Sequence, residues 1–309
     1  MRVAAVQLEA QVADLDANLE MCERLADEAG RRGAEAIALP EFFSTGIGFV
    51  PELVACALPA DGVATGLLLS LAQRHGALVG GSFLCRCDDG EIRNTFLLAR
   101  PDGTIAGRHD KDLPTMWENS FYVGGDDPGL IGAGEELEVG VALCWEMMRT
   151  QTVHRLAGRV DLVMGGSAWW SIPESWGPPA IMRRLEARNS ATARASAETF
   201  SAFVGAPVVH AGHAGALRCD TPWWPLPYEG HFQGATLITA ADGELLAFRA
   251  WHEGEGVVVA EVEPGRRAPL RNPPDRFWLH RRGVIPAISW NLHRAHGRRW
   301  YRRHARRAS

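Results

Sequence analysis

Residues 137–170 read LEVGVALCWEMMRTQTVHRLAGRVDLVMGGSAWW, and this stretch decides the fold class. Its two apolar runs, 137–146 and 160–170, have the length and composition of buried strands. Helical spacing fills 149–157 between them and stops at Gly158. A strand, a helix and a second strand in succession are typical of α/β proteins, in which helices cover buried sheets.

The same alternation extends outward along the chain in both directions. Seven further runs are typical of strands: 2–9, 34–41, 77–84, 94–103, 201–209, 233–240 and 256–262. Three further segments have helical spacing: 18–31, 65–75 and 179–198. We therefore expect one α/β domain over residues 1–265, a layered sandwich of mostly buried sheets covered by helices.

The composition is that of a globular protein, with 309 residues of which 46% are hydrophobic and 22% charged. The amino terminus enters a strand directly, and no later stretch approaches the roughly 18 uncharged apolar residues of a membrane span, so we expect a cytoplasmic protein. The six cysteines lack the density of a disulfide scaffold and the spacing of metal ligands. We expect reduced thiols, no metal site and no cofactor.

Positive charge is concentrated at the carboxyl end of the chain. Residues 266–309 hold thirteen Arg and one acid, Asp275, a charge of +12; because the whole chain carries −5, residues 1–265 carry −17. We therefore predict a basic C-terminal arm that packs on the body or on a neighbouring subunit. The arm also interleaves Arg with aromatic residues, which suits single-stranded nucleic acid, but the acidic body would repel phosphate. Nucleic acid is the less favoured partner.

The chain has a single lysine. Of its 32 basic side chains 31 are Arg, and only Lys111 carries an ammonium. Since Arg serves every other need for positive charge, this Lys indicates a site that requires a compact charge in place of a planar guanidinium.

Three segments place a reactive side chain at or just beyond the end of a predicted strand, where α/β sheets form their sites. They contain Glu41, Lys111 and Cys144. Glu41 alone would be typical of a solvated loop or a helix cap, and Cys144 alone of core packing, but apolar residues on both sides of Glu41 imply burial beside a partner. Together the carboxylate can take the thiol proton, while the ammonium favours the thiolate and faces an oxyanion.

The sequence around these three residues contains four ordered motifs: Leu39-Pro40-Glu41, KDLPTMWE at 111–118, Gly124-Gly125-Asp126 and Leu143-Cys144-Trp145-Glu146. They resemble the Glu–Lys–Cys signature of the nitrilase superfamily of carbon–nitrogen hydrolases. The resemblance implies a four-layer αββα sandwich, with two mixed β-sheets flanked by helices, as the catalytic domain over 1–265. It also implies a homo-oligomer, and Glu41 as general base, Lys111 as oxyanion stabiliser and Cys144 as nucleophile.

Three more residues are predicted to support the site. Glu118 corresponds to the family's second glutamate, which orients the lysine or the substrate, although a helix-start acid is an equal alternative. Glu146 lies two positions beyond the nucleophile, so a continuing strand would point it into the pocket as a substrate contact. Of four indoles in predicted loops, Trp169, Trp170, Trp223 and Trp224, we expect Trp169 to form a pocket wall.

The predicted activity is hydrolysis of a small-molecule, non-peptide amide through a thioacyl-enzyme, which gives a carboxylic acid and ammonia or an amine. Hydrolysis of a nitrile and transfer of the acyl group to an amine use the same residues and are the alternatives. A papain-like pair of Cys144 with His210 or His213 would also make a thiolate, but it leaves Glu41 and Lys111 without roles.

Overall fold

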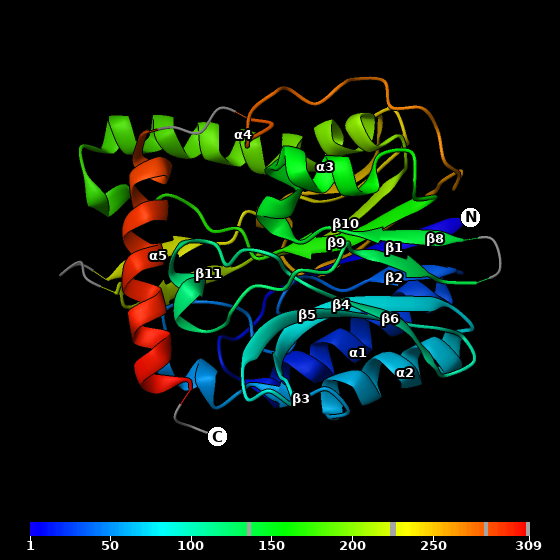
Figure 1. The fold of residues 1–309 in the computed structure, drawn as a ribbon, viewed down its shortest axis with the longest axis horizontal. Coiled ribbons are helices and arrows are strands. Elements are labelled where there is room, and N and C mark those ends of the chain that lie inside the picture. The colour runs from blue at the N-terminus through cyan, green and yellow to red at the C-terminus, as the bar shows by residue number, and fades with distance from the viewer. Residues whose placement is uncertain (135–136, 223–226, 281–283, 307–309) are drawn as a thin grey trace.

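The computed structural model describes residues 1–134, 137–222, 227–280 and 284–306, and it has an α/β fold with one large mixed sheet network (Figure 1). Its helices are α1 (Leu15–Arg31), α2 (Val63–His75), α3 (Thr150–Leu156), α4 (Pro179–Val204) and α5 (Val284–His304). The short 3₁₀ segments are η1 (Pro51–Val54), η2 (Met116–Ser120), η3 (Cys144–Met148), η4 (Glu174–Trp176) and η5 (Trp251–Glu253).

The strands follow the alternation that the sequence predicts, with additional short ones. In the first half of the chain they are β1 (Arg2–Leu8), β2 (Ala36–Ala38), β3 (Leu58–Pro59), β4 (Leu78–Arg86), β5 (Ile92–Ala99), β6 (Ile105–Asp110), β7 (Leu130–Gly132) and β8 (Glu138–Val141). The later ones are β9 (Leu162–Ser167), β10 (Val208–His213), β11 (Ala216–Cys219), β12 (Tyr228–His231), β13 (Thr236–Thr239), β14 (Leu245–Arg249) and β15 (Gly256–Glu261).

Hydrogen bonds join thirteen strands of the described chain into one network, and β11 and β12 form a separate pair. One half of the network runs in the order β15-β1-β2-β4-β5-β6, with β3 also paired to β4, and the other in the order β14-β13-β10-β9-β8-β7. Within the described ranges, the strand pairing that connects the halves has only two residue pairs, Gln7 with Gly212 and Leu8 with His213. Both halves mix parallel and antiparallel pairing. The expected division into two separate sheets stays a prediction, because this thin link makes the network continuous.

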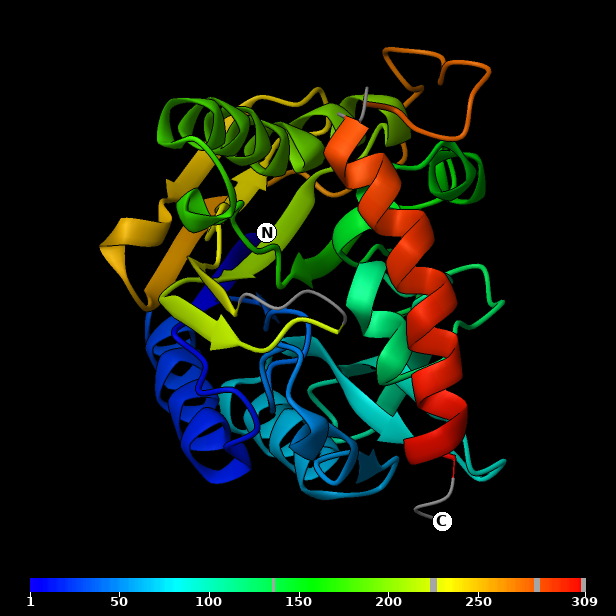
Figure 2. The same cartoon turned by 90° about the vertical axis from the view of Figure 1, so that its left-hand side faces the viewer.

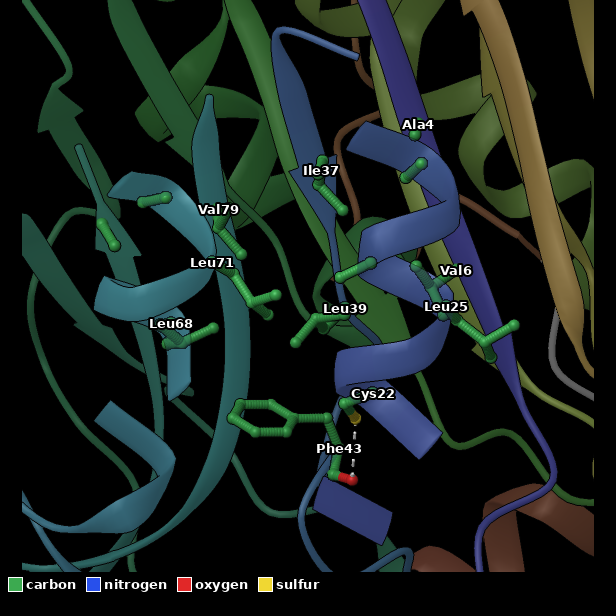
Figure 3. Packing of buried hydrophobic residues seen from close by; sticks show 14 of the residues in the cluster. Ala4, Val6, Cys22, Leu25, Ile37, Leu39, Phe43, Leu68, Leu71 and Val79 are labelled. Atoms are coloured by element: carbon green, nitrogen blue, oxygen red, sulfur yellow. Dashed lines mark hydrogen bonds between the residues drawn. The ribbon is translucent and has the colours of Figure 1, made fainter. Parts of the chain in front are cut away.

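Helices α1 and α2 cover the outer face of the first half (Figure 3). Leu25 of α1 and Leu71 of α2 belong to one buried cluster with Val6 of β1, Ile37 of β2 and Val79 of β4. Burying a side chain of this size contributes about 1.5–3 kcal/mol to stability, so these contacts hold the two helices on the sheet. The helix-spaced apolar residues therefore form the face that docks on the sheet.

Two further cores complete the arrangement. Between the two halves, Ala5 of β1 and Leu98 of β5 pack in one cluster with Met164 of β9. On the far face of the second half, Val153 of α3 and Phe200 of α4 pack in another cluster. Figure 1 shows the resulting order, with α1 and α2 on one side of the strands and α3 and α4 on the other.

The structure corrects two of the predicted strands. The strand expected over 201–209 begins only at Val208, because α4 continues through Val204 and ends at Gly205 in a left-handed conformation. The strand expected over 137–146 ends at Val141, and the chain then turns into η3. Both corrections concern where a strand stops or starts, and the second one changes the site.

The described part of the C-terminal arm packs on the body of its own chain. Figure 2 shows α5, in red, running across the molecule in front of the strands. Two of the aromatic rings predicted to suit nucleic-acid stacking, those of Trp290 and Tyr301, are buried, whereas Phe277 is exposed. Among the described residues, no helix is both long and apolar enough to cross a membrane.

Candidate active site

Three chain segments that follow strands of both halves of the network bring the predicted catalytic residues together. Glu41 follows β2, Lys111 follows β6 directly, and Cys144 follows β8. All three side chains are buried. The charges of Glu41 and Lys111 both act on the pKa of the Cys144 thiol, which places the three groups in one electrostatic cluster.

Lys111 is held between two carboxylates. Its Nζ donates to Glu41 Oε1 at 2.7 Å and to Glu118 Oε2 at 2.8 Å, and all three side chains are buried. Burial alone would lower the pKa of Lys111, but Glu118 and Glu41 outweigh it and raise that pKa well above its usual value. The ammonium therefore stays charged inside the protein.

Glu41 is fixed by three donors. Besides Lys111, its carboxylate accepts from Asn94 Nδ2 at 2.9 Å and from the backbone N–H of Ala168 at 3.0 Å. Burial raises the pKa of Glu41 to about 7, against the opposing effect of Lys111. A carboxyl group with such a pKa can gain or lose a proton near neutral pH, as a general acid and base requires.

Glu118 makes the contacts that both expectations for it require. Its Oε2 accepts from Lys111 and from the backbone N–H of Thr115 at 2.9 Å, and the Tyr122 hydroxyl donates to the same oxygen. The contact with Thr115 caps the start of η2. The helix-start acid and the lysine partner are thus the same residue.

Cys144 begins η3 in a left-handed backbone conformation, with φ of +51°. A residue other than glycine in this region costs about 1–3 kcal/mol, and such strain is concentrated at functional sites. Burial, followed by the charge of Glu41, raises the pKa of the Cys144 thiol well above its usual value, while Lys111 lowers it. The resting sulfur is therefore a thiol that needs a base.

The structure does not bring Glu146 into the pocket, contrary to the sequence-based expectation. Because β8 ends before Cys144, the strand period of two does not extend to Glu146. Its carboxylate accepts from the backbone N–H groups of Leu143 and Asp112 at 2.8 and 3.1 Å and lies 3.0 Å from His109 Nε2. Glu146 thus supports the turn that carries the nucleophile.

The glycine pair of the third motif lets the lysine segment pack closely. A Cβ on Gly124 would lie 1.9 Å from the carbonyl oxygen of Asp112, a distance that no side chain can occupy. The neighbouring Gly125 donates its backbone N–H to the carbonyl of Lys111 at 3.0 Å. Glycine at position 124 therefore allows the backbone to approach the segment that holds Lys111.

A cavity opens beside the nucleophile and reaches about 680 Å³ with its mouth included. Cys144 and Trp169 both line it, so the structure places Trp169 where a pocket wall was expected. The indole N–H of Trp169 donates to Asn189 Oδ1 of α4 at 2.9 Å, which fixes the ring. Trp170 lines the same cavity, whereas Trp223 and Trp224 lie outside the described residues.

The two histidines of the papain-like alternative hydrogen bond elsewhere. His210 contacts the backbone carbonyl of Ala235 at 2.9 Å, and His213 contacts that of Glu41 at 2.6 Å. Burial lowers the pKa of each to about 4, so both rings are neutral. His213 therefore positions the backbone of Glu41, and the geometry favours Glu41 over either histidine as the base for Cys144.

Sequence reasoning missed Asn94 and Tyr122, which hold the two carboxylates. Asn94 lies on β5, where it is a buried polar residue in an apolar strand, and that contrast was its only signal. Tyr122 had no comparable signal in the sequence. Within the described ranges no group of three or more His, Cys, Asp or Glu side chains has the arrangement to hold a metal ion.

The sequence is similar to those of known proteins. The sequence model of the carbon–nitrogen hydrolase family matches residues 2–272. The chain is 28% identical to a nitrilase of Pyrococcus abyssi over 51% of this chain and 60% of that one, and 30% identical to an omega-amidase of Xenopus laevis over 42% and 50%. These matches thus span only half to three fifths of the relatives' length.

The fold is shared with solved structures. XC1258 of Xanthomonas campestris, a CN-hydrolase superfamily protein with an arsenic adduct in its active site, superposes with a TM-score of 0.66 at 18% identity, over 84% of this chain and 89% of that one. At this identity the likeness concerns the fold alone. The family match over residues 2–272 shows that the chain belongs to the carbon–nitrogen hydrolase family.

Proposed function

We propose that the protein hydrolyses a small-molecule amide other than a peptide, with Cys144 as nucleophile, Glu41 as general base and Lys111 as oxyanion stabiliser. The observation that carries this proposal is the ammonium of Lys111 buried between Glu41 and Glu118, with the charges of all three acting on one thiol. Perturbed acids and bases gathered at a nucleophile that lines a cavity are typical of an active site.

In the first half of the reaction the Glu41 carboxylate accepts the Cys144 proton, and the sulfur attacks the carbonyl carbon. A carbon–sulfur bond forms while the carbonyl electron pair moves onto oxygen. The ammonium of Lys111 and the backbone N–H of Trp145, which already faces the sulfur, stabilise this oxyanion. The carbon–nitrogen bond then breaks as Glu41 returns the proton to nitrogen, and ammonia or an amine leaves.

In the second half a water molecule gives a proton to Glu41 and attacks the thioester carbon. The new carbon–oxygen bond replaces the carbon–sulfur bond, the sulfur recovers its proton from Glu41, and a carboxylic acid is released. A carboxyl pKa of about 7 suits a group that must accept and donate a proton in each half.

A nitrile is the second candidate substrate, because one of the matched relatives is a nitrilase and the other an omega-amidase. Attack on a nitrile carbon uses the same thiolate and the same ammonium. Ammonia release from matched pairs, such as butyramide and butyronitrile, separates the two activities. Turnover of the nitrile alone would overturn the choice of an amide.

The test of the nucleophile is the mass of the protein after incubation with candidate amides and nitriles. We expect an acyl increment that maps to Cys144. In Cys144→Ala that increment should be absent and turnover should fall by at least about 10³-fold, with the thermal unfolding temperature essentially kept. Substantial turnover by Cys144→Ala would refute the assignment. Added hydroxylamine detects acyl transfer, since a transferase would form the hydroxamate faster than the acid.

We also propose that the two halves of the strand network act as the two sheets of an αββα sandwich. Three features support this: the link of only two residue pairs, the apolar cluster between the halves, and the helix pairs on the two outer faces. Such a scaffold carries Glu41, Lys111 and Cys144 on segments that follow strands of both halves.

A further inference from the structure

Helix α5 contributes to the wall of the candidate active site, although it begins at Val284 and the family match ends at residue 272. His293 of α5 lines the same cavity as Cys144. One turn earlier, Trp290 stacks on Trp145, with ring centroids 5.4 Å apart and planes only 4° apart. The helix therefore contacts the residue that follows the nucleophile and also faces the cavity.

The position of α5 is fixed by close backbone contact and by hydrogen bonds. A Cβ on Gly297 would lie 2.6 Å from the Cβ of Asn119, so the helix backbone rests directly on η2. Farther along, the Tyr301 hydroxyl accepts from the backbone N–H of Ile92 and donates to Glu91, both at 2.8 Å. Since η2 also carries Glu118, the contact of Gly297 with Asn119 joins α5 to the segment that holds Lys111.

Aromatic rings dominate the remainder of the cavity. Five indoles line it, those of Trp117, Trp145, Trp169, Trp170 and Trp176. The rings of Trp117 and Trp170 are stacked, with centroids 4.4 Å apart. Among the described residues that line the cavity no side chain is charged, since burial lowers the pKa of His293 to about 4 and leaves its imidazole neutral.

From this lining we infer that α5 completes an acyl pocket that selects amides of flat, aromatic, uncharged acyl groups. The inference rests on the proposed function, because it assigns the cavity to the acyl part of that substrate. An aryl ring can pack against the indole faces, and its burial is favourable in proportion to its apolar area. A carboxylate at the far end of the acyl chain would lose its hydration without gaining a cationic partner.

The first test compares kcat/KM for 3-phenylpropionamide, butyramide and succinamate, with ammonia release as the assay. We expect the phenyl substrate to exceed butyramide by at least about tenfold, and succinamate to be the poorest. Equal values for the first two, or a preference for succinamate, would overturn the inference while leaving the amide hydrolase proposal intact.

The second test examines α5 in the full-length chain. His293→Ala and Trp290→Phe should raise KM for 3-phenylpropionamide more than for butyramide, whereas loss of general stability would not discriminate between the substrates. Asn291→Ala, an exposed neighbour on the same helix, is the matched control. Thermal unfolding shows whether each variant is folded. An unchanged substrate ratio in both folded variants would contradict a role for α5 in the pocket.

Binding to Cys144→Ala, measured by calorimetry, separates the pocket from the chemistry. We expect 3-phenylpropionamide to bind at least about tenfold more tightly than butyramide. If this preference were found but the wild-type protein formed no acyl adduct, the proposed function would be contradicted and the inference about the pocket would stand. Equal binding would sink the pocket whether or not the enzyme turns over amides.

Discussion

Lys111 forms ion pairs with two carboxylates, those of Glu41 and Glu118. Each of the three groups stabilises the charged state of its partners. Without Lys111, two buried carboxylates would face each other, and without the carboxylates the ammonium would lose its proton to the apolar surroundings. Burial and the two carboxylates outweigh the effect of Lys111 on the Cys144 thiol, raise its pKa and keep it protonated until the base acts. In the proposed mechanism, the protonation state of Glu41 therefore controls the reaction.

We expect kcat/KM to decline below pH about 7. Burial raises the pKa of Glu41 from 4.5 to about 7, so acid protonates the base and prevents it from accepting the thiol proton. A pH–rate profile measures this acidic limb, and thermal unfolding at each pH confirms that the fold is intact. An acidic limb at the ordinary glutamate value of 4.5 would contradict the assignment of Glu41.

Lys111→Arg should reduce kcat/KM by at least about 10²-fold although the charge is kept. A guanidinium is larger and planar, and the fully buried site is built around one Nζ with carboxylates at 2.7 and 2.8 Å. Steady-state kinetics measure the loss. The matched control is Arg183→Lys, which makes the opposite exchange at a side chain that is 61% exposed and should leave kcat/KM unchanged.

At the scale of elements, the site depends on short segments that begin with unusual backbone. Phe42 after Glu41, Met116 at the start of η2 and Cys144 at the start of η3 all have φ between +50° and +55°. At each of these turns, a side chain points in a different direction from the one it would have in a continuing strand. Helix α5 then covers η2 and stacks on η3 through Trp290 and Trp145.

Gly297→Ala should destabilise the docking of α5 on η2 by about 1–3 kcal/mol, because its Cβ would overlap Asn119. Chemical denaturation measures the change in the free energy of unfolding. Gly66→Ala is the control, since Gly66 lies in α2 with no atom within 4 Å of an added Cβ. That exchange should stabilise by roughly 0.5–1 kcal/mol. Equal effects of the two variants would show that close contact does not determine the position of α5.

The sequence was sufficient to predict the α/β class, and it singled out three residues that the structure places in one buried cluster. Lys111 stood out as the only lysine, and apolar neighbours indicated that Glu41 is buried. Glu146 was wrongly expected in the pocket because a strand period was extended past the real end of β8. Partners such as Asn94 could not be predicted, since the contact depends on which strands become neighbours in space.

The role of α5 was hidden by composition. Its many arginines indicated a basic arm, whereas the buried residues Trp290, His293, Gly297 and Tyr301 recur at helical intervals along one face. This pattern in the sequence indicates a helix that docks through one face. It does not indicate which element that face contacts. Only the folded chain shows that α5 contacts η2, whose Glu118 accepts a hydrogen bond from Lys111.

At the scale of the whole molecule, a body of charge −17 carries an arm of charge +12 folded against it. The arm is also rich in exposed apolar residues. Of eight large hydrophobic side chains that are exposed in the described chain, four belong to it: Leu270, Phe277, Ile288 and Leu292. Exposed apolar residues of this kind are typical of contact surfaces. The homo-oligomer stays a prediction, and these residues define the surface at which a subunit interface can be tested.

The double variant Ile288→Glu and Leu292→Glu should reduce the size of the assembly measured by light scattering after gel filtration. The two side chains lie one turn apart on α5 and are 53% and 48% exposed, so new charges there would repel their copies in a neighbouring subunit. Val63→Glu, at an exposed position on α2, controls for added charge elsewhere. An unchanged mass in the double variant would rule out this face as a subunit interface.

Five of the eleven tryptophans in the chain surround a single cavity. The wavelength and yield of indole emission depend on nearby water and on neighbouring rings, so displacement of solvent from this cavity changes a large share of the protein's own fluorescence. The molecule thus carries a built-in optical probe. Occupancy of the site can be followed in real time, without a label and without turnover.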